Sequence, residues 1–144
     1  MCTVRPPAPA DYGAMAELAG QLGYPCTARE LRMRLAAMKD PRQYAVFIAE
    51  MPDGQVCGWI GVYIFRGVET AACAEISGLI VDRSRRSRGI GKLLIDAAVK
   101  WARRRGSKEI AVHSNVVRRR AHRFYERHGF QHVKTQKLLA RRLT

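Results

Sequence analysis

The stretch from Glu75 to Lys92, with the sequence EISGLIVDRSRRSRGIGK, constrains the fold more than any other part of the chain. It begins as an apolar run of strand-forming residues, passes through a turn with four arginines, and enters an amphipathic segment at two closely spaced glycines. Glycine lets backbone amides approach a ligand, and the free N–H groups at a helix start favour anions. The stretch therefore predicts a strand, a phosphate-binding loop and a helix, with a merely solvated basic loop as the alternative interpretation.

The length of 144 residues is enough for one domain with a substantial core. No apolar run approaches the roughly 18 residues that a membrane-spanning helix needs. The N-terminal sequence MCTVRPPAPADYG lacks the apolar centre of a signal peptide, and the four cysteines are scattered without a CxxC pair. We therefore expect a single domain over residues 1–144, no membrane contact, reduced thiols and a cytoplasmic location.

The net charge of +14 is distributed unevenly along the chain. Residues 1–80 contain seven Lys or Arg and eight Asp or Glu, a balance of −1, whereas residues 81–144 contain nineteen and four, a balance of +15. Such asymmetry predicts that the second part meets a polyanion. Charge alone leaves nucleic acid, a ribosomal surface and a phosphorylated cofactor open.

Hydrophobic periodicity and turn residues predict the element order β-α-α-β-β-β-α-β-α-β-β. Asp11 is expected to cap the first helix, a T-x-x-E capping box opens the second at Thr27, and Gly129 is expected to follow the last. Pro52-Asp53-Gly54 predicts the turn of an antiparallel hairpin. The expected strands are 3–5, 44–50, 56–65, 72–81, 109–114, 130–134 and 137–143, and the expected helices are 11–23, 27–40, 90–105 and 118–128.

The succession of strand 72–81, helix 90–105 and strand 109–114 predicts one parallel crossover pair in an otherwise antiparallel sheet. The expected fold class is therefore α/β or α+β, with a single mixed, mostly antiparallel sheet flanked by about four helices.

Two sequence motifs indicate which protein family has this order of elements. Residues 86–91 read RSRGIG, which matches R/Q-x-x-G-x-G/A at a helix start; this is no P-loop, and Leu94 stands where a GxGxxG fingerprint needs its third glycine. The preceding LIV (residues 79–81), Asn115 and the run AHRFYERHGF (residues 121–130) match L-x-V and N…A-x-x-F-Y-E-x-x-G-F. In these motifs and in element order, the chain resembles the GCN5-related N-acetyltransferase (GNAT) superfamily, and within it bacterial small-amine or aminoglycoside-type members.

The resemblance implies acetyl-CoA as the acyl donor. It implies that the loop and helix start hold the pyrophosphate, which assigns this role to Arg86, Ser87, Arg88, Gly89, Ile90, Gly91 and Lys92. It further implies that Leu79, Ile80 and Val81 pair with the pantetheine arm and that Asn115 contacts the same arm. Backbone dipoles and basic side chains suit such an anion.

The reaction implied by the resemblance is attack of an amine on a thioester, within a ternary complex. A primary amine with a pKa near 10 is mostly protonated at neutral pH, so a base or a water relay has to remove a proton. Glu75 is the candidate base, with Glu50 and Glu69 in reserve, and strand alternation places Glu75, Ser77, Leu79 and Val81 on one face. Tyr125 matches the tyrosine that, in the family, protonates or stabilises the departing thiolate.

The acceptor remains open at this stage. The slightly acidic half around the expected acceptor site favours a small cationic amine, and the alternative is a protein N-terminus or lysine. A nucleic-acid-binding module is a remote alternative, because no nucleic-acid motif accompanies the basic residues. The four histidines form no metal-ligand pattern, so no metal is expected, and a homodimer is consistent with the family and with an edge strand at the C-terminus.

Overall fold

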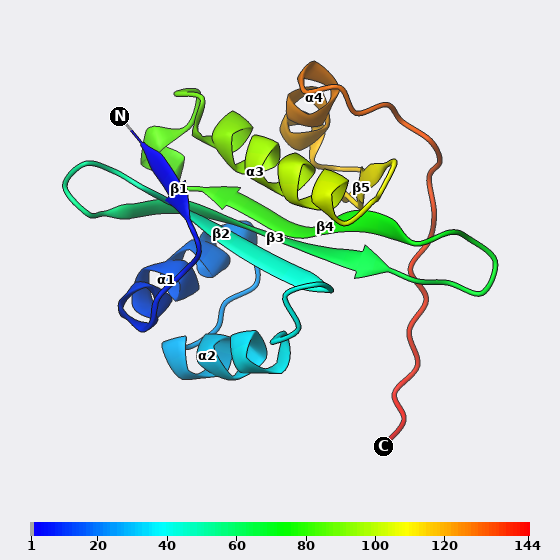
Figure 1. Ribbon diagram of the computed structural model, residues 1–144, viewed down its shortest axis with the longest axis horizontal. Helices are drawn as coiled ribbons and strands as arrows, with labels where there is room; N and C mark the ends of the chain where they lie inside the picture. Colours follow the sequence, from blue (N-terminus) through cyan, green and yellow to red (C-terminus); the bar gives the residue numbers. More distant parts are fainter. Residues whose placement is uncertain (1) are drawn as a thin grey trace. The chain divides into compact units, whose positions relative to one another are not determined.

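The computed structural model describes residues 2–144, which form two compact units, residues 2–112 and 113–144 (Figure 1). The first unit contains the whole sheet, and the second contains the last helix. No helix among the described residues is long and apolar enough to cross a membrane. The strands are β1 (Thr3–Arg5), β2 (Tyr44–Glu50), β3 (Val56–Phe65), β4 (Cys73–Val81) and β5 (Ile110–Val112); the α-helices are α1 (Tyr12–Leu22), α2 (Ala28–Ala37), α3 (Ile90–Arg104) and α4 (Arg119–Arg127), and the 3-10 turns are η1 (Pro9–Asp11) and η2 (Arg83–Arg85).

The sheet has the strand order β1-β2-β3-β4-β5. The first three pairings are antiparallel, whereas β4 and β5 are parallel and are connected through α3. A parallel pair needs a crossover that returns the chain to the same edge of the sheet, and a helix supplies it. The predicted mixed sheet with one crossover is therefore confirmed.

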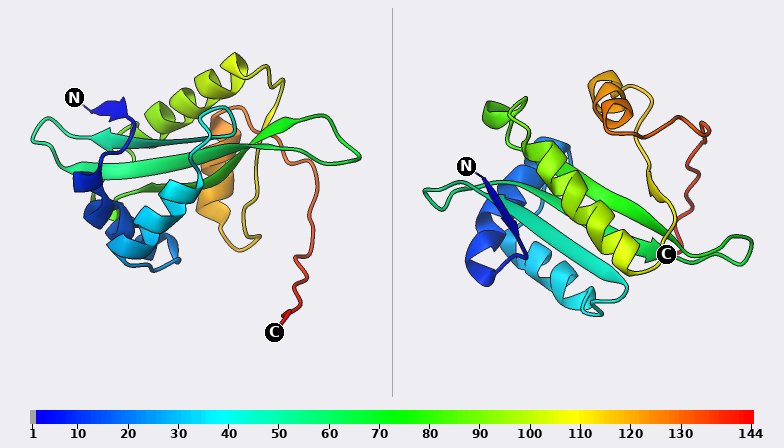
Figure 2. Two further views of the ribbon diagram at one scale, coloured as in Figure 1. Left: turned by 60° about the horizontal axis from the view of Figure 1, so that its bottom comes forward. Right: turned by 45° about the horizontal axis from the view of Figure 1, so that its top comes forward.

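Helices cover both faces of the sheet. Helices α1 and α2 lie on one face and α3 lies on the other (Figures 1 and 2). On the α1 face, the indole Nε1 of Trp59 donates to the carbonyl oxygen of Met15 at 3.1 Å, which joins β3 to α1. The buried cluster on this face consists of Met15, Leu18, Leu31, Ile48, Val56 and Ile80.

Several local sequence signals form the predicted structure. The Thr27 hydroxyl accepts from the Glu30 amide at 3.1 Å, and the Thr27 amide donates to the Glu30 carboxylate at 3.0 Å, so the capping box is confirmed. Asp11 is the N-cap residue of α1, as predicted, but the prediction that its side chain caps the helix is wrong, because this side chain accepts no hydrogen bond from an α1 amide. Asp11 instead forms an ion pair with Arg5 at 2.8 Å and accepts from the Ala8 amide. A nearby guanidinium is the stronger partner for a carboxylate.

The two strands expected at 130–134 and 137–143 are absent from the structure. Residues 130–144 lie in neither a helix nor a strand, and Val133, Leu138 and Leu143 are fully exposed. The expectation rested on local β-propensity, but a strand exists only where a neighbouring backbone accepts its hydrogen bonds. Residues 130–144 have the β-propensity that the prediction used, but the structure pairs them with no neighbouring strand.

Candidate functional site

The loop between β4 and α3 presents backbone amides at the start of a helix. Gly89 has a φ of 79° and is the N-cap residue of α3. Because glycine has no side chain, no side-chain group of the N-cap residue accepts from the first amides of the helix. The first intrahelical bond runs from Leu93 N to the Gly89 carbonyl at 3.2 Å, so the amides before it have no intrahelical acceptor. Ser87 also has a positive φ, 66°, which is uncommon outside glycine and is a feature of strained ligand-binding loops. The predicted strand-to-helix junction at residues 86–92, which we call the cradle, is therefore present, and its role as an anion site stays a prediction.

Side chains anchor this cradle to the neighbouring segments. The Asp82 carboxylate caps η2 by accepting from the amide and the hydroxyl of Ser84, and a hydrogen bond to Asp82 from Ser84 lowers the pKa of this carboxyl. Arg86 Nε donates to the Val81 carbonyl oxygen at 3.3 Å, which holds the end of the cradle loop against the end of β4. Arg85 donates to the Gln55 side-chain oxygen at 2.5 Å. These bonds fix the path of the loop before a ligand arrives.

Arg88 and Lys92 supply charge at the surface of the cradle. The Arg88 side chain is exposed. Lys92 Nζ forms an i,i+4 ion pair with Asp96 at 2.7 Å, with both side chains more than half exposed. An exposed pair of this kind is weak.

The second half of β4 has one open edge. Strand β5 pairs only with Ala74–Ile76 of β4, opposite Ile110–Val112. No residue of β5 therefore lies beside Leu79, Ile80 or Val81, whose other edge pairs with β3. An extended ligand with amide groups can use such an edge as an additional strand does. The open edge leads directly into the cradle.

The predicted alternation along β4 is wrong, because a bulge interrupts it. Gly61 of β3 pairs with Gly78 and Val62 pairs with Ile76, so Ser77 is an extra residue on β4 without a cross-strand partner. Glu75 pairs with Tyr63, on the face of β3 that also carries Trp59 and contacts α1. Leu79 and Val81 pair with Ile60 and Gly58 and face α3. Glu75 and these two residues therefore lie on opposite faces of the sheet.

Glu75 is hydrogen-bonded to a tyrosine that sequence reasoning did not nominate. The Tyr63 hydroxyl donates to Glu75 Oε2 at 2.5 Å, and both side chains are half-buried. Burial, and secondarily the bond to Glu75, raises the pKa of Tyr63 to about 12. The phenol therefore stays protonated at neutral pH and keeps donating to the carboxylate. Only the register of the β3–β4 hairpin reveals this pair.

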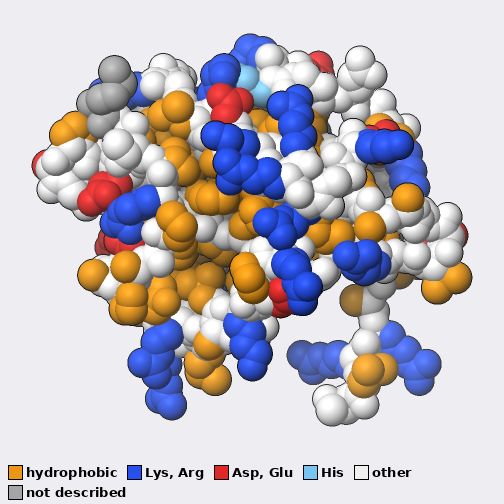
Figure 3. Space-filling view, viewed as in Figure 1, with side chains coloured by type: hydrophobic (Ala, Val, Ile, Leu, Met, Phe, Trp, Pro, Cys, Tyr) orange, Lys and Arg blue, Asp and Glu red, His pale blue; other side chains and the backbone are white. Residues whose placement is uncertain are grey.

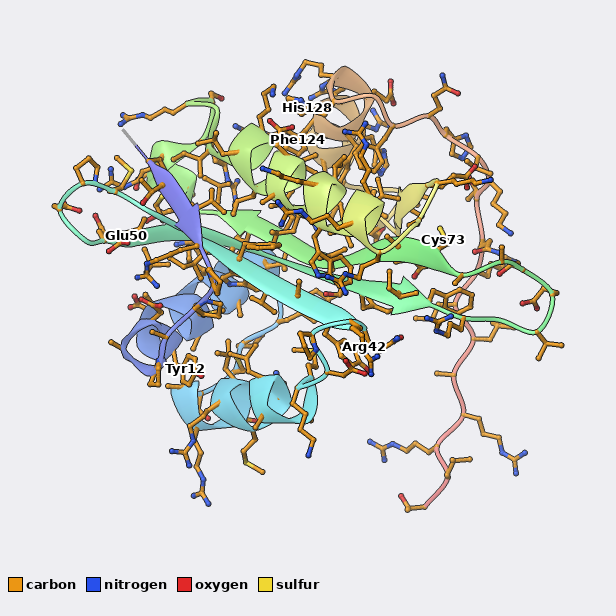
Figure 4. The ribbon with its side chains drawn as sticks, viewed as in Figure 1. Tyr12, Arg42, Glu50, Cys73, Phe124 and His128 are labelled. Carbon is orange, nitrogen blue, oxygen red and sulfur yellow. The ribbon has the colours of Figure 1, made fainter. Side chains whose placement is uncertain are left out.

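The reserve carboxylates have different surroundings. Glu50 forms an ion pair with Arg5, whose Nε lies 2.7 Å from Glu50 Oε2. Glu50 is the last residue of β2, at the end of this strand that lies away from Arg42 (Figure 4). Glu69 is exposed in the loop between β3 and β4. Of the three predicted carboxylates, Glu75 is the one that accepts a hydrogen bond from a tyrosine, whereas Glu50 is held by a guanidinium.

The second unit holds Asn115 and Tyr125. The Asn115 side-chain oxygen accepts from the Val117 amide at 3.1 Å, and its backbone oxygen contacts His122 Nε2 at 2.9 Å. Asn115 thus stabilises the turn before α4 through its side-chain and backbone oxygens.

Tyr125 lies in the last turn of α4, and Gly129 is the C′ residue of this helix, as predicted. The amides of Gly129 and Phe130 donate to the carbonyls of Glu126 and Tyr125, and Gly129 has a φ of 90°, which is a Schellman motif. The rings of Tyr125 and Phe130 lie 5.4 Å apart, and those of Phe124 and His128 lie 4.6 Å apart, on the helix seen in Figure 4. Burial raises the pKa of Tyr125 despite the opposing charge of Arg118.

The structure thus combines a mixed sheet with one parallel crossover, a stretch of β4 that β5 leaves unpaired, and unpaired amides at the start of α3. Comparison with known families agrees. Residues 14–130 match the model of the acetyltransferase (GNAT) family, and the chain belongs to this family. Its class is that of the acetyl-CoA-dependent N-acetyltransferases, so the resemblance noted in the sequence is confirmed.

Individual relatives point the same way. The chain is 29% identical over 133 residues to an aminoglycoside N(6')-acetyltransferase type 1 of Stenotrophomonas maltophilia, which covers 90% of this chain and 86% of that protein. It is 36% identical over 75 residues to the uncharacterized N-acetyltransferase MJ1207 of Methanocaldococcus jannaschii, which covers 52% of this chain but only 31% of that protein. The structure of AAC(6')-Iy in complex with a bisubstrate analog, CoA-S-monomethyl-acetylneamine, has the same fold, with a TM-score of 0.82 and 24% identity over 99% of both chains.

Proposed function

We propose that this chain, acting as one catalytic domain over residues 1–144, transfers the acetyl group of acetyl-CoA to a small cationic amine by direct attack in a ternary complex. The observation that carries the proposal is the continuous path from the open edge of β4 to the uncapped start of α3. An extended amide-containing arm suits the first part, and a pyrophosphate suits the second. The residues present therefore fit acetyl-CoA.

In this proposal the cradle of residues 86–92 binds the pyrophosphate. The amides at the start of α3 donate to phosphate oxygens, and Arg88 and Lys92 supply positive charge. Arg86 keeps the loop in place through its bond to the Val81 carbonyl. The backbone of Leu79, Ile80 and Val81 pairs with the pantetheine arm, and the Asn115 amide contacts the same arm.

Glu75 serves as the general base. Acetyl-CoA supplies an acyl group activated as a thioester. The ammonium first gives one proton to the Glu75 carboxylate, directly or through water, and the free amine nitrogen then attacks the thioester carbonyl carbon. A C–N bond forms, the C–S bond breaks, and the nitrogen releases its second proton to solvent. The bond from Tyr63 supports this role, because it orients the carboxylate and remains in place at neutral pH.

Tyr125 stabilises the departing thiolate. A thiolate with a pKa near 8.5 is a weaker base than a tyrosinate with a pKa near 10, so complete proton transfer is unfavourable by about 2 kcal/mol. Burial raises the pKa of Tyr125 and increases this difference. The phenol therefore donates a hydrogen bond, and solvent delivers the proton to the thiolate.

The charge of the first 80 residues supports a cationic acceptor. Their balance of −1 contrasts with +15 in the remainder, so an amine cation is repelled less there than elsewhere on the chain. A relative named as an aminoglycoside acetyltransferase covers most of the chain, which supports an amine of this kind. We place the reaction in the cytoplasm as part of the proposal, because the free thiols suit a reducing compartment.

A panel of amines tests the proposal through release of free CoA from acetyl-CoA. We expect turnover with aminoglycosides or polyamines, with a kcat/KM at least about tenfold above that for peptides with a free N-terminus or lysine. Amines acetylated beforehand are the control and should give no release. Preferential turnover of peptides would mean that the acceptor is a protein N-terminus or lysine and not a small cationic amine. Salt-sensitive nucleic-acid binding without acetyl-CoA binding would overturn the enzyme function altogether.

A further inference from the structure

A cavity with a volume of about 430 Å³ opens at the end of the first unit where β2 begins and β3 ends. Three segments converge on it: the turn before β2, the two ends of the β3–β4 connection, and the C-terminal end of α3. Figure 4 shows Arg42 at this end of the sheet. Its lining residues are Arg42, Gln43, Ile64, Arg66, Ala72, Arg104, Arg105, Gly106 and Ser107.

Four arginines and no carboxylate line this cavity, which we call the arginine pocket. Arg42 has a long contact with Asp40, 3.7 Å between Nε and Oδ1, and its side chain is 78% exposed. Arg66 Nε donates to the Gln43 side-chain oxygen at 3.4 Å. Among the described residues, Arg104 and Arg105 form no ion pair, and the helix C-terminus beside them compensates their charge in part. The pocket therefore concentrates positive charge that the chain itself leaves largely unneutralised.

The arginine pocket is separate from the cradle and from Glu75. The cradle lies at the start of α3 and the pocket at its end, and a helix of 15 residues spans about 22 Å. Ile64 lines the pocket and is the residue after Tyr63 on β3, so its side chain lies on the α3 face while the Tyr63–Glu75 pair lies on the α1 face. The sheet therefore stands between the pocket and the proposed base.

We propose that the arginine pocket binds a small, multiply charged phosphate anion. Guanidinium groups recognise phosphate oxygens through pairs of parallel hydrogen bonds, and several phosphates are needed to balance four cations. The volume is within the range of small-molecule sites. No aromatic side chain lines the pocket for stacking on a base, which favours a compact anion over a nucleic-acid strand. The proposal does not depend on the acetyl-transfer function.

One contact couples the pocket to the catalytic strand. The Ser107 hydroxyl lines the pocket, accepts from the Ala74 amide at 2.9 Å and donates to the Glu109 carbonyl at 2.6 Å. Ala74 directly precedes Glu75 on β4. An anion that orders Arg105 and Ser107 thus also orders the start of the strand that carries the proposed base.

Calorimetric titration with tripolyphosphate tests this site. The double variant Arg42→Gln/Arg105→Gln should bind at least about tenfold more weakly than the wild type, because two charge-assisted contacts are removed. The matched control Arg29→Gln/Arg32→Gln removes two exposed charges from α2 and should leave binding unchanged. The cradle variant Arg88→Gln/Lys92→Gln identifies any contribution from the cofactor site, and the pocket affinity should survive in it.

Three outcomes would overturn the proposal: equal affinity in the pocket and control variants, loss of binding only in the cradle variant, or oligonucleotide binding through these arginines without tripolyphosphate binding. Circular dichroism establishes that each variant is folded. If Arg42→Gln/Arg105→Gln unfolds, Arg66→Gln/Arg104→Gln provides the same comparison. Loss of tripolyphosphate binding in the pocket variants with acetyl transfer intact distinguishes this site from the proposed active site.

Discussion

At the scale of single residues, the pairing of Glu75 with Tyr63 matters most for the chemistry. A carboxylate that accepts a proton has to be held in one orientation, and a phenol whose pKa is about 12 provides a donor that does not ionise at working pH. The bulge at Ser77 places this pair on the face of the sheet that contacts α1. The proposed base and the tyrosine that donates to it therefore come from two adjacent strands of one hairpin.

Replacement of Glu75 by Gln should lower kcat by about 10²-fold or more, because the amide retains the shape but does not accept a proton. The affinity for CoA should change little, since the cradle is untouched. Steady-state kinetics and CoA titration measure the two effects separately. Glu69→Gln, in the exposed loop before the same strand, is the matched control. Equal losses of turnover in both variants, or none in Glu75→Gln, would remove Glu75 from its role.

The raised pKa of Tyr63 predicts how stability changes at high pH. An unfolded tyrosine ionises near pH 10 and Tyr63 near pH 12, so the unfolded chain releases this proton first. The contribution of Tyr63 is complete below about pH 10 and is lost as the pH rises toward 12. Urea unfolding at several pH values should show that the free energy of unfolding falls less steeply between pH 10 and 12 in Tyr63→Phe than in the wild type. The exposed-residue variant Tyr24→Phe should follow the wild type; if both variants lose stability equally, Tyr63 is not the source.

At the scale of elements, the β3–β4 hairpin depends on small residues where the two strands and their covering helices come close. A methyl group at Gly61 would lie 2.5 Å from the Ser77 hydroxyl, and one at Gly78 would lie 3.0 Å from the Trp59 ring. The side chain of the bulged residue Ser77 therefore fits only because the β3 residue next to it, Gly61, has no side chain. This local packing determines which face of the sheet Glu75 occupies.

The variant Gly58→Ala tests that packing. Its methyl group would lie 2.8 Å from the Ile80 carbonyl oxygen and 3.2 Å from Leu94. The Ile80 backbone is held in the sheet, so moving it away from the methyl group costs free energy. We expect a loss of about 1–3 kcal/mol in the free energy of unfolding, measured with urea. Gly20→Ala, in α1 with no atom near the new methyl group, should instead stabilise the chain by about 0.5–1 kcal/mol. Similar effects at both positions would contradict the packing argument.

At the scale of the whole molecule, charge and exposed apolar residues set the surface properties. Lys and Arg side chains far outnumber acidic ones on the face shown in Figure 3, in keeping with the net charge of +14. The last residues of the second unit expose Leu138 and Leu139, with 95% and 86% of their surfaces accessible. Large exposed apolar side chains in one segment are typical of an interaction surface. The edge strand on which the expected homodimer rested is absent, so we propose that a homodimer forms through these exposed apolar residues of segment 131–144 instead.

Removal of residues 131–144 should convert this dimer into a monomer without unfolding the first unit, because no strand of the sheet comes from the deleted segment. Light scattering gives the mass, and circular dichroism gives the sheet content. Substitution of Lys134 and Lys137 by Gln, which keeps the apolar residues, is the control and should leave the mass unchanged. An unchanged mass after truncation would rule out the segment as the dimer contact.

The sequence by itself determined the features that depend on a few neighbouring residues. The capping box at Thr27, Gly129 as the C′ residue of α4, the strand-to-helix junction at residues 86–92 and the crossover through α3 were all predicted, because each follows from local backbone preferences or chain order. Tertiary structure alone decided the face of Glu75, its partner Tyr63 and the convergence of four arginines at the end of α3. It also left residues 130–144 without strands despite their β-propensity. The physical reason is that register, bulges and pairing depend on contacts between distant segments, which no local pattern encodes.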